Sequence, residues 1–160
     1  MRSEWEVNHA VDIYADMVRR ICFCHLKNQM DTEDIFQNVF LKYMLYDGTF
    51  ESAEHEKAWF IRVTINACKD FFKSLLRRNT VPLDTVAELA AEEAQDHSQV
   101  LQAVLDLPEK YRDVIYLFYY ESYTAAEIAD ILKSRESTIY SQLCRGRTML
   151  KKSLGGEIDG

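Results

Sequence analysis

The sequence of 160 residues predicts an all-α protein. Only five glycines and two prolines interrupt it, and no stretch alternates apolar and polar residues as a half-buried strand would. Apolar residues recur instead at three- and four-residue steps, which is the period of an amphipathic helix. Residues 79–99 contain five acidic residues and no lysine or arginine. The sequence therefore predicts two small helical domains, 1–78 and 100–160, joined by an acidic linker, 79–99.

The first domain is predicted to begin with two helices. Residues 8–28 carry apolar side chains at helical spacing. Residues 31–46 follow, with Asp31 as the expected N-cap and acidic residues in the first turn, where the helix dipole favours them. The second helix has a broad apolar stripe, formed by Ile35, Phe36, Val39, Phe40, Tyr43 and Met44. Asp47 and Gly48 then mark a turn.

A loop over residues 49–56 precedes a third helix, which is predicted over 57–78. Its expected core residues are Trp59, Phe60, Val63, Ala67, Phe71 and Leu75. A second face has three basic residues and one amide, namely Arg62, Asn66, Lys69 and Lys73. Basic side chains follow phosphates, an amide bonds base edges and nearby rings stack on bases, as single-stranded nucleic acid requires. A helix face exposed only to solvent has the same pattern, so this stripe alone leaves both interpretations open.

The second domain contains the pattern of a helix-turn-helix. After a short helical segment, 100–107, Pro108 stands where a new, strongly apolar helix can start. Thr124 and Glu127 then form a capping box, and Ala126, Ile128, Ala129, Ile131 and Leu132 are expected to face inward. The pattern breaks over 133–135 and resumes with Ile139, Leu143, Met149 and Leu150. A short helix, a tight turn and a longer helix can place the second helix in the DNA major groove.

The charge of this segment agrees with DNA binding. Residues 133–154 contain six basic residues and one acidic residue, whereas the whole chain has a net charge of −7. An ordinary helix pair with basic residues at its C-terminal end would also satisfy the helix dipole. The side chains expected to reach base edges or phosphates are Arg135, Glu136, Ser137, Thr138, Tyr140, Ser141, Cys144, Arg145 and Arg147.

Several other classes of protein are disfavoured. The N-terminal residues do not resemble a signal peptide, and no apolar run approaches the roughly 18–20 residues that span a bilayer. We therefore expect a soluble, cytoplasmic protein. Cys22, Cys24 and His25 lie close in sequence, but positions i and i+2 do not share a helix face, so we expect reduced thiols and no metal. No phosphate-binding loop or catalytic triad is visible, so we expect neither a cofactor nor an enzyme.

Three segments together resemble a known family. Residues 31–41 resemble the polymerase-binding helix of bacterial sigma factors, and residues 58–66 resemble their promoter-melting helix. Residues 107–112, followed by 124–150, resemble their C-terminal helix-turn-helix domain. A chain with only these two domains and a short linker is similar to the extracytoplasmic-function group, also called group IV.

The resemblance implies a role for each surface. The largest subunits of core RNA polymerase would be bound by Asp34, Gln37, Asn38, Phe40 and Leu41. The opened promoter strand would be held by Phe50, Trp59, Arg62, Asn66, Lys69 and Lys73. Asn66 matches the position near the pocket for a flipped-out base, whose unstacking costs a few kcal/mol. Members of the group are commonly inhibited by an anti-sigma protein, which is therefore an expected partner.

Some residues depart from the family pattern. Asn38 stands where the family usually has Glu, and Lys133 replaces the usual turn glycine, which predicts a strained or shifted turn. Tyr140 and Gln142 replace positions that are often basic. The sequence thus predicts a sigma factor that melts specific promoters and directs transcription initiation. The alternative is a stand-alone helix-turn-helix regulator with an N-terminal interaction domain, which would not bind core polymerase.

Overall fold

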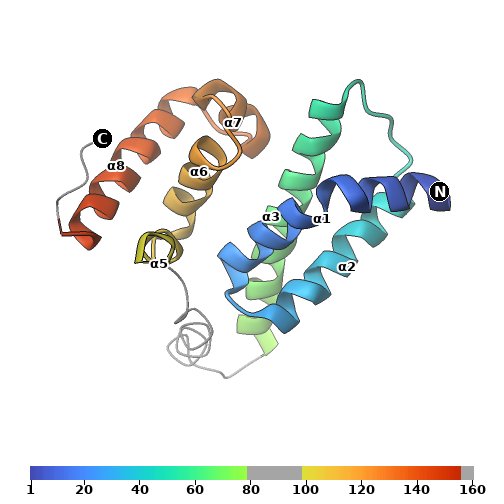
Figure 1. Cartoon of the computed structure of the whole chain (residues 1–160), viewed down its shortest axis with the longest axis horizontal. Helices are drawn as coiled ribbons and strands as arrows, with labels where there is room; N and C mark the ends of the chain where they lie inside the picture. The colour runs from blue at the N-terminus through green and yellow to red at the C-terminus, as the bar shows by residue number, and fades with distance from the viewer. Residues whose placement is uncertain (79–98, 156–160) are drawn as a thin grey trace. The chain divides into compact units, whose positions relative to one another are not determined.

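The computed structural model describes residues 1–78 and 99–155, in which every regular element is an α-helix. The chain divides into two compact units, Met1–Ala94 and Gln95–Gly160, and each is described by itself (Figure 1). The prediction of an all-α fold with two helical domains is confirmed. The predicted linker lies outside the described residues, apart from Gln99, which begins a helix. No helix in the described ranges is long and apolar enough to cross a membrane.

The first unit is a bundle of three helices, α1 (Glu4–Leu26), α2 (Gln29–Leu45) and α3 (Ala53–Arg78). Each helix packs against both of the others (Figure 1). Side chains at the centre of this bundle are almost completely buried, among them Val18, Ile21, Cys22, Val39, Phe60, Ile61 and Cys68. Burial of apolar surface is the main source of stability for such a bundle, since helices in proteins are stabilised mostly by the packing of their apolar faces.

The caps of this unit explain why the predicted helix boundaries were displaced. The Ser3 hydroxyl accepts a hydrogen bond from the Glu6 N–H at 3.1 Å, so α1 begins before residue 8. The Asn28 side chain accepts the Asp31 N–H at 3.0 Å and caps α2, so the prediction that Asp31 is the cap was wrong. The Ser52 hydroxyl accepts the His55 N–H at 3.1 Å, and α3 starts directly after it. These polar caps precede the first apolar residue of each helix, so the spacing of apolar residues cannot locate the helix start.

The buried face of α3 is wider than the sequence predicted. Phe60 and Ala67 are buried as expected, whereas Trp59, Val63, Phe71 and Leu75 are only partly buried. The residues that complete the buried face are Ile61, Thr64, Ile65 and Cys68. Thr64 is accommodated there because its hydroxyl donates to the Phe60 carbonyl at 2.6 Å. The extra width follows from the packing of α3 against two helices, α1 and α2, rather than one.

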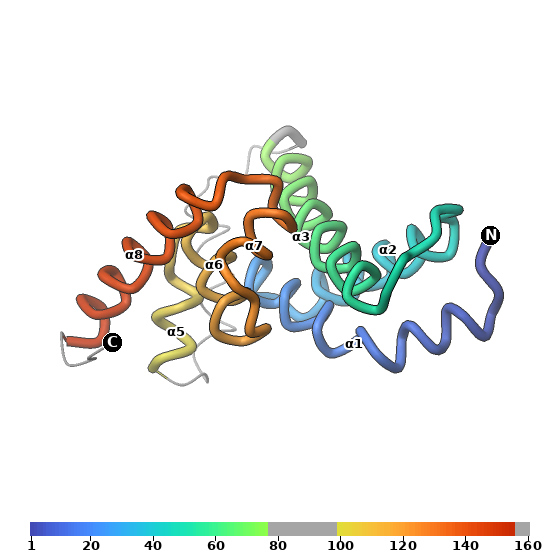
Figure 2. Tube along the Cα trace, turned by 90° about the horizontal axis from the view of Figure 1, so that it is seen from above, coloured from blue at the N-terminus to red at the C-terminus, as the bar shows by residue number. Residues whose placement is uncertain are grey.

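The second unit contains α5 (Gln99–Leu105), α6 (Glu109–Tyr119), α7 (Ala125–Leu132) and α8 (Glu136–Ser153). Figure 2 shows α6 beside α7 and α8, and α5 contacts both α6 and α8. Arg112 ties two of these helices together, because its guanidinium donates to the Leu105 carbonyl at 3.3 Å. These contacts fix the orientation of α7 and α8 within the second unit.

The helix-turn-helix has the predicted local chemistry. The Thr124 N–H donates to the Glu127 carboxylate at 2.9 Å and the Glu127 N–H donates to the Thr124 hydroxyl at 3.2 Å, which is a complete capping box. Lys133 caps the C-terminal end of α7 and adopts the left-handed conformation with φ 53°. The turn therefore keeps the backbone shape for which glycine is usual, with a lysine in that place.

Two predicted inward-facing residues of this motif point elsewhere. Ala125 is buried and Ala126 is exposed, and Met149 is also exposed. On α8 the inward position near the middle of the helix is Gly146, where an added Cβ would lie 3.0 Å from Ile115 Cγ1. The apolar period did not reveal Gly146 because a glycine has no side chain to count. Its role is to let α8 approach α6 closely.

Candidate polymerase and nucleic-acid interfaces

The outer face of α2 presents four of the five residues predicted to bind polymerase. Asp34, Gln37, Asn38 and Leu41 are exposed, with 49 % of the Leu41 side chain accessible. Phe40 lies instead in the core with 6 % exposure, and its ring centroid is 5.2 Å from that of Phe60. Phe40 therefore supports α2 from beneath and is not on the surface that a partner would touch.

A shallow groove runs beside this face, between α2 and α3. Its volume is about 310 Å³, and Asn38, Leu41 and Lys42 line it from α2. The α3 side is formed by Ala67, Asp70 and Phe71. An apolar floor with amide and charged groups at the rim suits a partner side chain better than a free small molecule, because the groove is open to solvent.

The basic face of α3 is present as predicted. Asn66, Lys69 and Lys73 are exposed and Arg62 is partly buried, and their spacing places all four along one side of the helix. Arg62 and Lys69 also make interactions within the protein. The face can follow a phosphate backbone while Asn66 offers both a donor and an acceptor to a base edge.

Aromatic rings gather where α2 ends and α3 begins. The Trp59 ring centroid lies 5.2 Å from Tyr46 and 5.9 Å from Phe50, and Tyr43 lies 5.8 Å from Trp59. Tyr46 is exposed, while Phe50 and Trp59 are partly buried. We call Tyr43, Tyr46, Phe50 and Trp59 the aromatic cluster. Partly exposed rings next to a basic helix face can stack on the bases of an unpaired strand.

Burial and hydrogen bonding change the acidity of one member of the aromatic cluster. Burial, together with the hydrogen bond that Tyr43 donates to Glu56 at 3.0 Å, raises the pKa of Tyr43 from 10.0 to about 12. The phenol therefore stays protonated at neutral pH and remains a donor. This hydrogen bond joins the end of α2 to the first turn of α3.

The helix α8 presents most of the residues predicted to bind duplex DNA. Its exposed members are Arg135, Glu136, Ser137, Thr138, Tyr140, Ser141, Cys144 and Arg145. Tyr140, near the start of this helix, is 59 % exposed. A hydrogen bond from Arg145 lowers the pKa of Tyr111, so this arginine also contacts α6. The face combines hydroxyl, aromatic and basic groups that can reach into a groove.

Arg147 differs from the other residues of this set. Its Nε donates to the Tyr119 hydroxyl at 2.6 Å, and its guanidinium lies 5.4 Å from the Phe118 ring centroid. Arg147 thus joins α8 to the end of α6, and it is partly buried. In this arrangement the Nε donor of Arg147 is directed towards α6.

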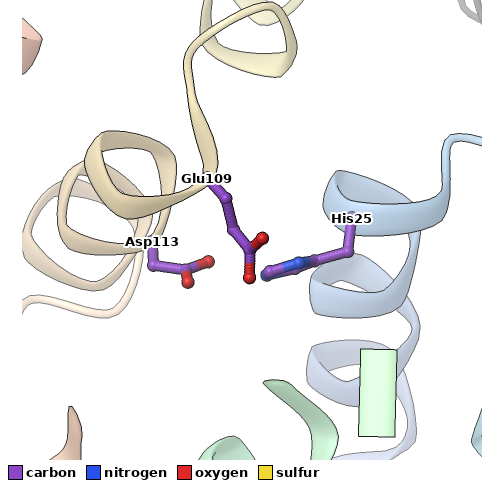
Figure 3. Close-up of side chains that lie close together, drawn as sticks. All are labelled: His25, Glu109 and Asp113. Atoms are coloured by element: carbon purple, nitrogen blue, oxygen red, sulfur yellow. The ribbon is translucent and has the colours of Figure 1, made fainter. Parts of the chain in front are cut away.

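The described residues also contain acidic and thiol groups that could suggest a metal. Figure 3 draws His25 of α1 with Glu109 and Asp113 of α6. We assign no metal site to these three residues, because His25 belongs to the first unit and both acids belong to the second. All four cysteines are free; Cys22 and Cys68 are buried, Cys24 is partly buried, and Cys144 is exposed.

Sequence reasoning missed several residues of the first unit. Arg2 lies over the aromatic cluster, and Tyr43 and Tyr46 complete that cluster from α2 and its end. The density of aromatic residues between Tyr43 and Phe60 was a usable signal. Nothing in the sequence near Arg2 indicated its contact, because the contact joins positions more than forty residues apart.

Comparison with known families agrees with this geometry. Residues 10–78 match the family described as Sigma-70 region 2, and residues 97–150 match the family described as Sigma-70, region 4. The chain is 26 % identical over 166 residues to the ECF RNA polymerase sigma factor SigW of Bacillus subtilis (strain 168), covering 90 % of this chain and 86 % of SigW. It is 26 % identical over 153 residues to RNA polymerase sigma factor SigV of the same organism, covering 94 % and 89 %.

A solved structure has the same fold. The sigma factor RpoE from Bartonella quintana, in a co-crystal structure with the anti-sigma factor NepR, superposes with a TM-score of 0.70. The match covers 96 % of this chain and 99 % of that one, at 18 % sequence identity. At this identity the similarity concerns the fold alone.

A helical unit with a basic helix face and a second unit with a helix-turn-helix are typical of a DNA-binding transcription protein. With the region 2 and region 4 matches, the chain belongs to the sigma-70 family, in its extracytoplasmic-function group. It binds core RNA polymerase, recognises promoter DNA and directs transcription initiation. The alternative of a stand-alone regulator is set aside, because its N-terminal domain would have no reason to match region 2.

Proposed function

We propose that the two domains divide the promoter between them. Domain 1–78 binds core polymerase through α2 and holds the melted strand on α3. Domain 100–160 reads an upstream element as duplex through α8, and the acidic segment 79–99 connects the two. The observation that carries this proposal is that Trp59, a member of the aromatic cluster, lies on the same helix as the basic face of α3.

The melted strand is assigned to α3 by its chemistry. Unpaired bases expose rings and edges that a duplex hides, so a site for them needs stacking surfaces and short-range donors. Trp59 and Phe50 supply the rings, and Asn66 supplies an amide about two turns beyond Trp59 on α3. Arg62, Lys69 and Lys73 supply positive charge along the same side, which attracts the phosphates.

The polymerase contact is assigned to the exposed part of α2, namely Asp34, Gln37, Asn38 and Leu41. Leu41 offers an apolar centre and the three polar residues offer a rim, which is the usual anatomy of a protein interface. Phe40 is assigned a supporting role, because its burial beneath this face keeps α2 in place.

The test is a pull-down with core polymerase and the full chain. Reversing a rim charge in a protein interface weakens binding, so Asp34→Arg is expected to lower the affinity for core polymerase by about tenfold or more. The matched control is Asp12→Arg, which reverses an exposed charge on α1. Equal retention of Asp34→Arg and the wild-type chain would contradict the assignment of this face.

Three further properties belong to the proposal. The chain acts in the cytoplasm, where polymerase and promoter DNA are found, and it has no catalytic activity of its own. It is also inhibited by an anti-sigma protein, as RpoE in the structural match is bound to NepR. The exposed apolar residues Met30, Leu41 and Leu45 on α2 support this, because such a surface is stabilised by a covering partner.

A further inference from the structure

The side chain of Arg2 makes an unusual set of contacts far from its place in the sequence. Its guanidinium carbon lies 4.5 Å from the Tyr43 ring centroid and 5.1 Å from that of Phe50. Its Nη2 donates to the Gly48 carbonyl at 2.6 Å, and its Nη1 donates to the Glu6 carboxylate at 3.2 Å. Only 15 % of this side chain is exposed.

These contacts hold the segment that joins α2 to α3. The Arg2 backbone N–H donates to the Met44 carbonyl at 2.9 Å. The main chain and the side chain of Arg2 therefore both bind residues at or just after the end of α2. Gly48 lies directly under the Tyr46 ring, since an added Cβ there would collide with that ring. Arg2 thus binds Gly48, Gly48 packs against the Tyr46 ring, and that ring lies 5.7 Å from Phe50 and 5.2 Å from Trp59.

We propose that Arg2 is a positioning residue for promoter opening, which fixes the 46–52 segment and the aromatic cluster in the shape that receives an unstacked base. The proposal rests on the proposed role of this region in holding the melted strand. Arg2 acts through Tyr43, Phe50 and the Gly48 carbonyl and does not itself bind the base.

The physical reason is preorganisation. A base that leaves the duplex loses its stacking, which costs a few kcal/mol, and the receiving rings offset this cost only if they are already in place. A segment between two helices lacks the repeating backbone hydrogen bonds of a helix. The planar, multi-donor guanidinium of Arg2 restricts this segment by stacking on two rings and binding one carbonyl. Lysine cannot reproduce that combination, because it lacks the planar fork.

The experiment compares two promoter templates in the presence of core polymerase. One template is fully paired, and the other carries a preformed mismatched bubble at the melted region. Arg2→Ala is expected to slow open-complex formation on the paired template by about tenfold, the factor that loss of a partly buried cation–π contact represents. On the bubble template, where unstacking has already occurred, the loss is expected to be less than about threefold. Affinity for core polymerase is expected to stay unchanged.

Two further variants complete the test. Arg2→Lys keeps the charge and is expected to retain most of the defect on paired DNA. Arg19→Ala is the matched control, because Arg19 also stacks on a ring of this unit, 4.0 Å from the Phe36 centroid, and pairs with Glu33 at 2.9 Å. It is expected to melt the paired promoter at the wild-type rate.

The outcomes are separable. Equal losses on both templates would indicate a general folding defect and overturn the proposal, as would an undiminished rate on paired DNA. Full rescue by Arg2→Lys would assign the effect to charge alone and also overturn it. If the wild-type chain with core polymerase formed an open complex on neither template, the proposed role of the first domain would fail independently of Arg2.

Discussion

Lys133 occupies a backbone conformation that costs most residues energy. Its φ of 53° and ψ of 50° lie in the left-handed region, where the Cβ of an L-residue approaches the following carbonyl. Lys133→Gly removes this strain, and we expect it to raise the free energy of unfolding of the second domain by about 0.5–1 kcal/mol. The change in the free energy of unfolding is measured by thermal or urea unfolding of the full chain, monitored with a probe in the second domain.

The control for this prediction is Lys133→Ala, which removes the charge but keeps the Cβ. We expect no gain in stability from it. An equal gain in both variants would mean that charge repulsion in the basic segment 133–154, and not the backbone, destabilises the turn.

Tyr43 gives the first domain a dependence on alkaline pH. The pKa is 10.0 in an unfolded chain and about 12 in the folded one, so between these values the folded state keeps a proton that the unfolded state has lost. The stabilising effect is fully present below pH 10 and is lost as the pH rises through 12. We expect Tyr43→Phe to reduce the fall in the free energy of unfolding over this window.

The measurement for Tyr43 combines chemical unfolding at several pH values with the ultraviolet absorbance of tyrosinate. The matched control is Tyr140→Phe, which removes an exposed phenol from the other domain. If the Tyr140 variant altered the pH dependence of the first domain as much as Tyr43→Phe, the assignment would be wrong.

At the scale of single residues, sequence reasoning was best where a role depends on local spacing. The capping box of Thr124 and Glu127 follows from a three-residue interval, and the structure contains it. The contacts of Arg2 and the burial of Phe40 depend on which segments meet in space, which no local interval encodes. For Phe40 the helical period fixed its side of α2 correctly, but the resemblance to sigma factors placed it on the surface.

At the scale of helices, the crossing of α8 and α6 depends on Gly146. An added Cβ there would lie 3.0 Å from Ile115 Cγ1 and 3.2 Å from Ile115 Cδ1. In an exposed helix a larger residue than glycine would be neutral or stabilising, but here it forces the two helices apart. We expect Gly146→Val to destabilise the second domain by about 1–3 kcal/mol, the usual cost of overpacking.

Circular dichroism with urea unfolding tests this prediction. Thr148→Val is the matched control, because it places the same side chain at an exposed position on the same helix. A stability of Gly146→Val equal to that of the control would show that α8 tolerates a wider crossing.

The sequence predicted which segments form helices more accurately than it predicted the residues at which those helices begin. Apolar period alone located the three helices of the first domain and the helix-turn-helix of the second. The starts of α1 and α3 were placed too late, because Ser3 and Ser52 cap them in polar segments without apolar period. The width of the buried face of α3 depends on its packing between two helices, which only the assembled bundle reveals.

At the scale of the whole molecule, charge favours binding to DNA only in the presence of polymerase. The chain has a net charge of −7, and three acidic residues lie at the start of α3: Glu51 just before it, and Glu54 and Glu56 in its first turn. We therefore expect the isolated chain to bind duplex promoter DNA weakly at moderate salt and the complex with core polymerase to bind it tightly.

Electrophoretic mobility shift with and without core polymerase measures this difference, with a duplex of scrambled sequence as the control. Binding by the complex is expected to weaken as salt rises, because phosphate contacts release counterions. Tight, sequence-specific binding by the chain alone would contradict the expectation and favour an independent regulator.

The distribution of thiols offers a practical route to watching promoter engagement. Cys144 is exposed on α8, Cys22 and Cys68 are buried, and Cys24 is partly buried. A maleimide dye should consequently attach to the unmodified chain chiefly at the helix that we propose enters the major groove. Fluorescence from that position would report docking on DNA in real time, without any engineered cysteine.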